Sequence, residues 1–265
     1  MKNQTRHTPR RRYSLGLAAA AVALASGCAT VESPSPRDPL ESFNRGVFAF
    51  NDAIDGALFK PIAYAYRDLT PAPARSCIRN VFGNLEDVWS AFNSLLQARG
   101  HDFFNTLGRV MFNSTMGLGG CIDVATMNGA HKINNDLGTT LGVWGIGTGP
   151  YLVAPIWGPT TLRDGAATLG GLAANVSPIT PIKAIDDVPV RNSIIGLYAL
   201  DTRESLLDAD ELVNRTALDR YSFIRDAYLQ RRDALVNQRT SDGAALPDYS
   251  DDELPDYTDP QPDTQ

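Results

Sequence analysis

Residues 137–182 read LGTTLGVWGIGTGPYLVAPIWGPTTLRDGAATLGGLAANVSPITPI, and only two adjacent side chains in this stretch, Arg163 and Asp164, carry a charge. An apolar run of this length is typical of a transmembrane helix, which needs about 20 apolar residues. Nine glycines and five prolines interrupt the run, however, and each proline removes a backbone N–H donor. Broken backbone in hydrocarbon must be satisfied by protein or by a water-filled cavity. The stretch is therefore predicted to be either a buried, turn-rich hairpin in a soluble core or a re-entrant element in a membrane that lines a cavity.

The N-terminus favours the membrane alternative. Residues 2–12 carry five basic and no acidic side chains, and the apolar segment 15–24 leads into Leu-Ala-Ser-Gly-Cys at 24–28. This order is typical of a secretory signal peptide. The last five residues resemble the bacterial lipobox, so residues 1–27 are predicted to be removed and Cys28 to be the lipid attachment site. The alternative is an ordinary cysteine after a generic signal peptide.

The residues after Cys28 suggest where the protein is anchored. Residue 29 is Ala rather than the Asp that keeps enterobacterial lipoproteins at the inner membrane, which implies an outer-membrane lipoprotein. Several acyl chains, each contributing about 0.8 kcal/mol per buried CH₂, give stable anchoring. Residues 28–37 are thus predicted to be the acylated cysteine and a short spacer that contains Pro and Ser.

The charge of the chain excludes one class of partner. Beyond residue 27 there are 19 Lys and Arg against 30 Asp and Glu, so no nucleic acid is expected as a partner. Eight of the acids lie after Thr240, where Lys and Arg are absent. Residues 240–265 are therefore predicted to be an acidic, disordered tail.

Residues 38–239 are predicted to form a single all-α domain. Phe43, Val47, Phe50, Ile54 and Leu58 recur at helical spacing, and similar patterns predict helices over 75–97, 102–116, 190–207 and 211–237. In 75–97, Val88, Phe92 and Leu95 belong to one apolar side. Several alternating strand-like segments are not found, which favours the all-α class.

Two local signals set the limits of the first helix. Asp38 is predicted to cap it, with Pro39 at the first helical position and Glu41 as the returning acid of a capping box. Pro61 is predicted to end or kink it.

The two other cysteines, Cys77 and Cys121, lie in what is predicted to be an oxidising compartment. They form a candidate disulfide, and the alternative of two separate buried thiols stays open at this point.

The sequence does not indicate an enzyme. It contains neither the G-x-S-x-G nucleophile motif nor a phosphate-binding P-loop, and Gly145–Pro150 lacks the dinucleotide spacing. His101 and His131 are far apart and have no partner at i+4, so no metal, cofactor or catalytic residue is predicted. Arg163 and Asp164 are either a buried or interfacial pair that satisfies backbone carbonyls, or a polar step on a pathway in a lipid environment.

Ordered motifs through most of the chain resemble those of one family. They are DPLESFNR (38–45), FAFN (48–51), VFGNL (81–85), RVMFNST (109–115), GLGGCIDVA (117–125), GVWGIGTGPY (142–151) and GPTTLRD (158–164). Together they resemble the MlaA (VacJ) family of outer-membrane lipoproteins over about residues 38–237. Cys121 and the acidic tail depart from the pattern of that family.

The resemblance implies a single ring-like helical domain with Gly/Pro-broken re-entrant hairpins, embedded in the inner (periplasmic) leaflet of the outer membrane. It implies an amphipathic channel that removes mislocalised phospholipids from the outer leaflet and maintains lipid asymmetry. The implied partners are phospholipids, a trimeric outer-membrane porin and a soluble periplasmic lipid carrier. The residues expected in the channel or hairpins are Trp144, Gly145, Gly147, Gly149, Pro150, Tyr151, Arg163 and Asp164.

Two other functions compete with transport. One is an envelope adaptor that docks porin or peptidoglycan without moving lipid, and the other is a lipid hydrolase with a cryptic nucleophile. The long uncharged stretch favours transport, because a soluble adaptor does not need 46 residues with two charges.

Overall fold

The computed structural model describes residues 35–240 of the chain. The elements in chain order are α2 (Glu41–Ile54), the π-helical turn η1 (Asp55–Phe59), α3 (Lys60–Leu69), α4 (Ala72–Leu96), α5 (Gly100–Thr115), α6 (Val124–Met127), α7 (Leu137–Val143), β1 (Tyr151–Ala154), β2 (Gly158–Thr161), α8 (Leu162–Ala173), α9 (Thr180–Lys183), α10 (Val188–Ser205), α11 (Leu207–Thr216) and α12 (Arg220–Thr240). The predicted all-α class is confirmed, with one short β-hairpin added. The predicted signal peptide, Cys28 and the acidic tail after residue 240 lie outside the described residues.

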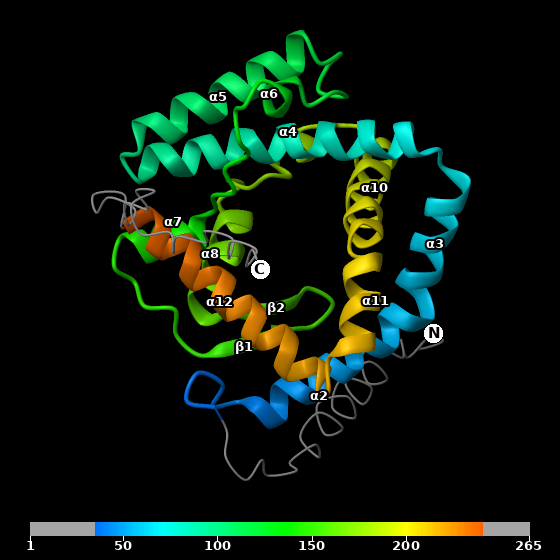
Figure 1. Cartoon of the computed structure of the whole chain (residues 1–265), viewed down its shortest axis with the longest axis vertical. Coiled ribbons are helices and arrows are strands. Elements are labelled where there is room, and N and C mark those ends of the chain that lie inside the picture. Colours follow the sequence, from blue (N-terminus) through cyan, green and yellow to red (C-terminus); the bar gives the residue numbers. More distant parts are fainter. Residues whose placement is uncertain (1–34, 241–265) are drawn as a thin grey trace, which may run out of the picture.

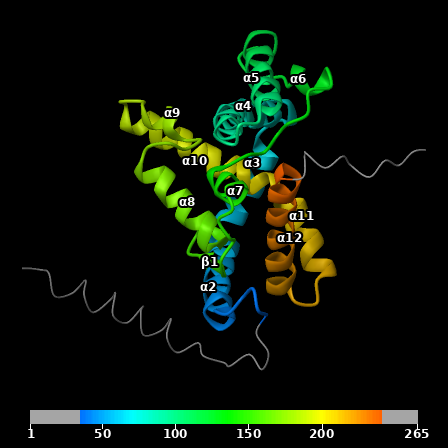
Figure 2. The same cartoon turned by 90° about the vertical axis from the view of Figure 1, so that its left-hand side faces the viewer.

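The helices surround a central region, as the ring-like prediction requires (Figure 1). Helix α4 forms one side, α3 with α10 and α11 the next, α2 the third, and α7, α8 and α12 the last (Figure 1). Turned by 90°, the molecule shows α8 and α9 on one side of α2 and β1, and α11 and α12 on the other (Figure 2). Among the described residues, we find no helix with the length and apolar character needed to cross a bilayer.

The first helix starts differently from the prediction. Helix α2 begins at Glu41 without a side-chain cap, so the assignment of Asp38 as a capping residue is wrong. The Asp38 carboxylate is fully buried and accepts hydrogen bonds from Asn44 Nδ2 (2.8 Å) and from the Tyr221 hydroxyl of α12. Glu41 bonds Arg45 Nε at 2.8 Å instead of returning to the cap. Tertiary partners have taken the groups that the local pattern assigned to a cap.

The helical backbone continues through Pro61, which occupies the first turn of α3, where a missing N–H is tolerated. The chain changes direction between α2 and α3, and η1 lies at that change (Figure 1). Wide π turns and prolines are both common causes of kinks. The structure thus places the break just before Pro61.

The predicted helix over 211–237 is wrong, because the structure divides it. Helix α11 ends at Thr216, and α12 starts at Arg220. Asp219 stabilises this junction, since its carboxylate accepts hydrogen bonds from the backbone of Tyr221 (3.1 Å) and from the Ser222 hydroxyl (2.7 Å). The apolar periodicity runs through the junction and therefore does not reveal it.

A turn-rich hairpin was predicted in this stretch, but its two paired β-strands were not. Strands β1 and β2 pair antiparallel, with Tyr151 opposite Thr161. Two asparagines of α2 bind the outer edge of β1: Asn44 accepts from Val153 N (2.9 Å) and donates to Tyr151 O (3.0 Å). Asn51, two turns along the same face, accepts from Ile156 N (2.7 Å) and donates to Ala154 O (3.0 Å). The side-chain amides thus satisfy backbone N–H and C=O groups that an edge strand would otherwise leave unpaired.

The polarity of the helix faces is opposite to that of an ordinary globular protein. In α4 the apolar residues Val88, Phe92 and Leu95 are 41–55 % exposed, whereas Asp87 and Asn93 are almost fully buried. Over residues 35–240, twelve buried side chains are hydrophobic and 23 are polar or charged. A soluble helix turns its apolar stripe to the core. The periodicity thus predicted the helix correctly, but its apolar stripe faces outwards.

Candidate functional site

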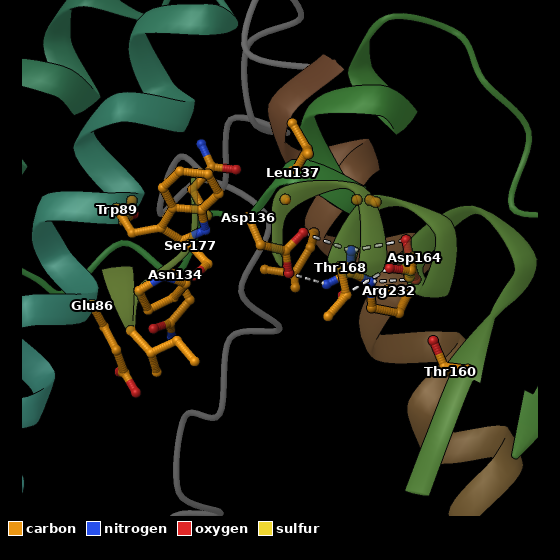
Figure 3. A pocket seen from close by; sticks show the side chains of 18 of the residues that line it. Glu86, Trp89, Asn134, Asp136, Leu137, Thr160, Asp164, Thr168, Ser177 and Arg232 are labelled. Carbon is orange, nitrogen blue, oxygen red and sulfur yellow. Dashed lines mark hydrogen bonds and ion pairs between the residues drawn. The ribbon is translucent and has the colours of Figure 1, made fainter. Parts of the chain in front are cut away.

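A cavity of about 440 Å³ lies between α4, the segment 132–138, β2, α8, α10 and α12. This volume is within the usual range for ligand pockets. Figure 3 shows Glu86 and Trp89 of α4 on one side and Asp136, Asp164 and Arg232 on the other. The lining combines charged groups with apolar side chains, among them Trp89, Trp157, Leu172, Tyr198, Tyr228 and Leu235. A lining of this kind suits an amphiphile.

Arg232 of α12 organises one wall of the cavity. Its guanidinium bonds Asp136 through Nη1 (2.5 Å) and Nη2 (2.9 Å), and Asp164 through Nη2 (3.1 Å). Asp164 also receives Arg163 Nε (2.9 Å) and the Tyr228 hydroxyl (3.1 Å). We call these five residues the Arg232 cluster. The cluster joins the start of α7, the start of α8 and the middle of α12. Each arginine in it is paired with an aspartate, and each aspartate with an arginine, as buried charges require.

The pKa values within this cluster follow from its contacts. Burial alone raises the pKa of the Asp136 carboxyl, but the hydrogen bonds from Arg232 and from the backbone of Thr139 reverse this and leave the pKa below its usual range. Burial and the neighbouring Asp164 raise the pKa of Tyr228. The acid is therefore charged and the phenol neutral at physiological pH.

Two glycines on α7 allow the cluster to assemble. A Cβ atom at Gly138 would lie 2.5 Å from Asp164 Oδ1 and 2.8 Å from Arg232 Nη2. A Cβ at Gly142, one turn later, would lie 2.8 Å from Arg163 Nη1. Both distances are shorter than real Cβ contacts, so a larger residue at either position would displace these charged side chains, and glycine allows α7 to approach them closely.

A second buried arginine lies behind the opposite wall of the cavity, where its partner Asp87 belongs to the lining. Arg109 of α5 bonds Asp87 Oδ2 (3.1 Å), both oxygens of Asp123 (3.1 and 3.2 Å) and the Thr126 hydroxyl (2.8 Å). We call Arg109, Asp87, Asp123 and Thr126 the Arg109 cluster. Hydrogen bonds that include the Thr126 hydroxyl and backbone outweigh burial and lower the pKa of Asp123 to about 2, whereas burial raises the pKa of Asp87. Asp87 also lines the cavity, so the two clusters lie on its two sides.

The structure places the predicted channel residues in two groups. Arg163 and Asp164 are buried in the Arg232 cluster, and Asp164 lines the cavity. The other six do not line the cavity: Tyr151 begins β1, and the connection from α7 to β1 contains Trp144, Gly145, Gly147, Gly149 and Pro150.

The contacts of that connection show what it does. Trp144 is exposed and donates from Nε1 to Leu96 O (3.2 Å), and Tyr151 is fully buried. Gly145 and Gly149 have φ values of +91° and +69°, which favour glycine, whereas Gly147 has open space around it. The connection thus positions the hairpin.

Sequence reasoning missed four residues of the cavity wall, Asp136, Gly138, Tyr228 and Arg232, and also Gly142, which lies against Arg163. The spacing Asp136-x-x-Thr139 is a helix-start signal that was available, since the Asp136 carboxylate accepts from Thr139 N at 2.7 Å. Glycines four residues apart on a helix also indicate a close approach. The distance of 96 residues between Asp136 and Arg232 has no local signal.

Cys77 and Cys121 are joined in a disulfide, and their Cα atoms lie 4.0 Å apart. The bond ties α4 to the loop that follows α5. Within residues 35–240 we find no group of His, Cys, Asp and Glu side chains that could hold a metal ion.

The chain is similar to known proteins over most of its length. The family model described as MlaA lipoprotein matches residues 36–235. The chain belongs to the MlaA lipoprotein family. The resemblance found in the sequence motifs is thereby confirmed.

Characterised members of the MlaA family are similar over most of their length. The intermembrane phospholipid transport system lipoprotein MlaA of Shigella flexneri is 35% identical over 232 residues, which cover 85% of this chain and 90% of the relative. The protein of the same name in Escherichia coli (strain K12) is 34% identical with the same coverage. A solved structure on the structural basis for maintenance of bacterial outer membrane lipid asymmetry is 34% identical, has a TM-score of 0.63, and covers 76% of this chain and 99% of its own.

Proposed function

We propose that this protein is the outer-membrane lipoprotein of an intermembrane phospholipid transport system. It takes mislocalised phospholipids from the outer leaflet through its polar interior and passes them to a soluble periplasmic carrier. The names of its relatives, and the subject of the similar solved structure, support transport and lipid asymmetry as the function. The direction, the leaflet and the carrier are part of the proposal.

The reversed polarity of the helices is the observation that carries this proposal. Large apolar side chains such as Phe50, Phe104 and Met111 are exposed on α2 and α5, whereas Arg109 is almost completely buried. Apolar surface on this scale marks a protein or membrane contact. Embedding in the periplasmic leaflet would place this surface against acyl chains.

The interior meets the opposite need. A phospholipid headgroup that crosses hydrocarbon without partners bears the full cost of burying its charges. A cavity lined by Asp136, Asp164 and Arg232 offers hydrogen-bonding groups, while Trp89 and Leu172 offer apolar contact. The tails would stay in lipid while the headgroup moves along the polar lining.

Anchoring and partners complete the proposal. Acylated Cys28 would hold the protein at the outer membrane, and a trimeric porin would be its neighbour there. Transport by this chain would be passive or coupled to its partners, without a catalytic step.

The test is the amount of phospholipid in the outer leaflet of a deletion strain. Complementation compares wild type with Asn134→Trp, which fills the cavity at a side chain that donates no hydrogen bond within residues 35–240. The matched control is Asn237→Trp, at an exposed position of α12 outside the cavity. We expect wild type and Asn237→Trp to clear the phospholipid and Asn134→Trp to leave it. An unchanged outer leaflet on deletion would contradict transport and favour the adaptor that docks porin or peptidoglycan.

A further inference from the structure

Every acid that lines the cavity is paired with a neighbouring base. Glu86 bonds Lys132 Nζ at 3.0 Å and the Tyr198 hydroxyl at 2.9 Å. Asp87 bonds Arg109, as described above. Asp136 and Asp164 share Arg232. Each carboxylate that lines the cavity therefore already has a basic partner.

One base in the lining has no such partner. Three cationic side chains line the cavity, and two of them, Lys132 and Arg232, are paired with acids. The third, Arg231, is exposed, and its guanidinium makes neither a hydrogen bond nor an ion pair with any of residues 35–240. Arg231 is therefore the one ionised side chain of the lining without an oppositely charged partner among residues 35–240.

Arg231 also stands on a fixed support. It directly precedes Arg232, whose bonds to Asp136 and Asp164 hold this part of α12 against α7 and α8. A guanidinium on a rigid helix loses less freedom when it binds than one on a loop, and it presents a planar fork of donors. The two parallel N–H donors of the guanidinium match two oxygens of a phosphate and can bind them through bidentate hydrogen bonds.

We infer that Arg231 binds the phosphate group of a glycerophospholipid in the cavity. This inference rests on the proposed function and names the group that the cavity recognises. The apolar lining from Trp89, Trp157 and Leu235 provides contact for the glycerol and upper acyl region. Since the acids are already paired, the cavity has no free anion for an ammonium headgroup. Recognition thus depends on the phosphate and is indifferent to the alcohol attached to it.

The experiment measures lipid affinity of the full-length, acylated protein in detergent micelles. A fluorescent phospholipid is displaced by phosphatidylglycerol, by phosphatidylethanolamine, or by diacylglycerol with the same chains. Arg231→Gln removes the charge, and Arg231→Lys keeps the charge but loses the fork. The matched control is Arg215→Gln, on an exposed arginine of α11 that pairs only with Glu211.

Arg231→Gln is expected to lower the affinity for both phospholipids by about tenfold or more, which corresponds to the loss of one charge-assisted hydrogen bond. It should leave diacylglycerol unchanged, and Arg231→Lys should give an intermediate affinity. Arg215→Gln should bind like wild type. Inorganic phosphate at millimolar concentration should not displace the lipid.

The outcomes separate this inference from the proposed function. Wild-type affinity in Arg231→Gln, with phospholipid binding otherwise intact, would overturn the role of Arg231 alone. If wild type binds no phospholipid, the inference and the proposed function both fail. Displacement by inorganic phosphate would assign the site to free phosphate rather than to lipid. A selective loss for phosphatidylethanolamine would also contradict the inference, because the headgroup alcohol would then matter.

Discussion

The Arg109 cluster and the Arg232 cluster use the same chemistry in two different surroundings. In each, a buried arginine lies between two aspartates. The Arg109 cluster joins α4, α5 and the start of α6, and a disulfide lies on the same side of the molecule. The Arg232 cluster joins α7, α8 and α12 without any covalent link among the described residues.

This difference shows how polar interiors are stabilised in a protein whose apolar side chains face outwards. In the Arg109 cluster, the side chains of Arg109 and Asp87 are 2 % and 1 % exposed, and that of Asp123 is 31 % exposed. The Arg232 cluster contributes more residues to the cavity lining, and its Asp136 side chain is 47 % exposed. The first therefore acts mainly as a structural support, and the second also forms a wall of the proposed lipid path.

The largest difference should appear when each arginine is removed. Arg109→Met leaves Asp87 buried without its main partner, and such losses cost roughly 3–5 kcal/mol. Arg232→Met should cost less, because Asp136 can be hydrated and Asp164 keeps Arg163. Denaturant unfolding in detergent measures both. Equal losses would mean that the two clusters are equally buried in solution.

The disulfide should contribute the next largest effect. It closes a loop of 44 residues, and disulfides typically stabilise by about 2–4 kcal/mol. The double variant Cys77→Ser with Cys121→Ser should lose this amount in the free energy of unfolding, and reduced wild type serves as the control. Lipid binding at the cavity should persist, since neither cysteine lines it. An unchanged unfolding free energy would show that the α4–α5 side needs no covalent support.

The sequence could predict the helices but not the face that each one buries. A period of 3.6 in Val88, Phe92 and Leu95 fits either orientation of α4, and the usual choice of an apolar core is wrong here. The membrane alternative was available from the lipobox at Cys28, which a local pattern can show. Which polar residues form hydrogen bonds or ion pairs with one another depends on segments far apart in the sequence, so a local pattern does not show it. The pattern could place Asn44 in a helix, but it could not show that its side chain hydrogen-bonds the edge of β1.

The cavity was predictable only in part for the same reason. The one charged pair of the uncharged stretch, Arg163 and Asp164, does reach the cavity wall through Asp164. Its main partner Arg232 lies 68 residues further along, so no spacing rule connects them. The glycines singled out earlier, Gly145 and Gly147, have open space around them, whereas Gly138 touches the charges. A count of glycines cannot distinguish these two situations.

A pair of glycine substitutions tests that distinction with a smaller effect. Gly138→Ala forces a methyl group against Asp164 and Arg232, and overpacking of this kind costs about 1–3 kcal/mol. Gly147→Ala has no heavy atom within 4 Å and should stay within about 0.5 kcal/mol of wild type. Thermal unfolding of the two variants is the measurement. A neutral Gly138→Ala would show that α7 does not approach the cluster this closely.

The smallest expected effect is the dependence of stability on pH, and its sign separates Asp87 from Asp136. The pKa of Asp136 lies below its unfolded value, so its stabilisation is present above about pH 4 and is lost as the pH falls through the folded value. Asp123 behaves alike, with a pKa of about 2. The pKa of Asp87 is raised, so the folded state takes up its proton more readily and gains stability as the pH falls.

Replacing each acid by its amide should therefore change the slope of unfolding free energy against pH in opposite directions. Between pH 5 and pH 2.5, the unfolding free energy of wild type should fall with pH. Asp136→Asn should make this fall less steep, and Asp87→Asn should make it steeper. Each change should amount to at most about 1.4 kcal/mol per pH unit, since one group binds at most one proton. The slope isolates this term from the ion pair that either substitution also removes. If both variants flattened the curve, the pKa of Asp87 would be lowered in the folded state like that of Asp136, and the contrast between the buried Asp87 and the more exposed Asp136 would not hold.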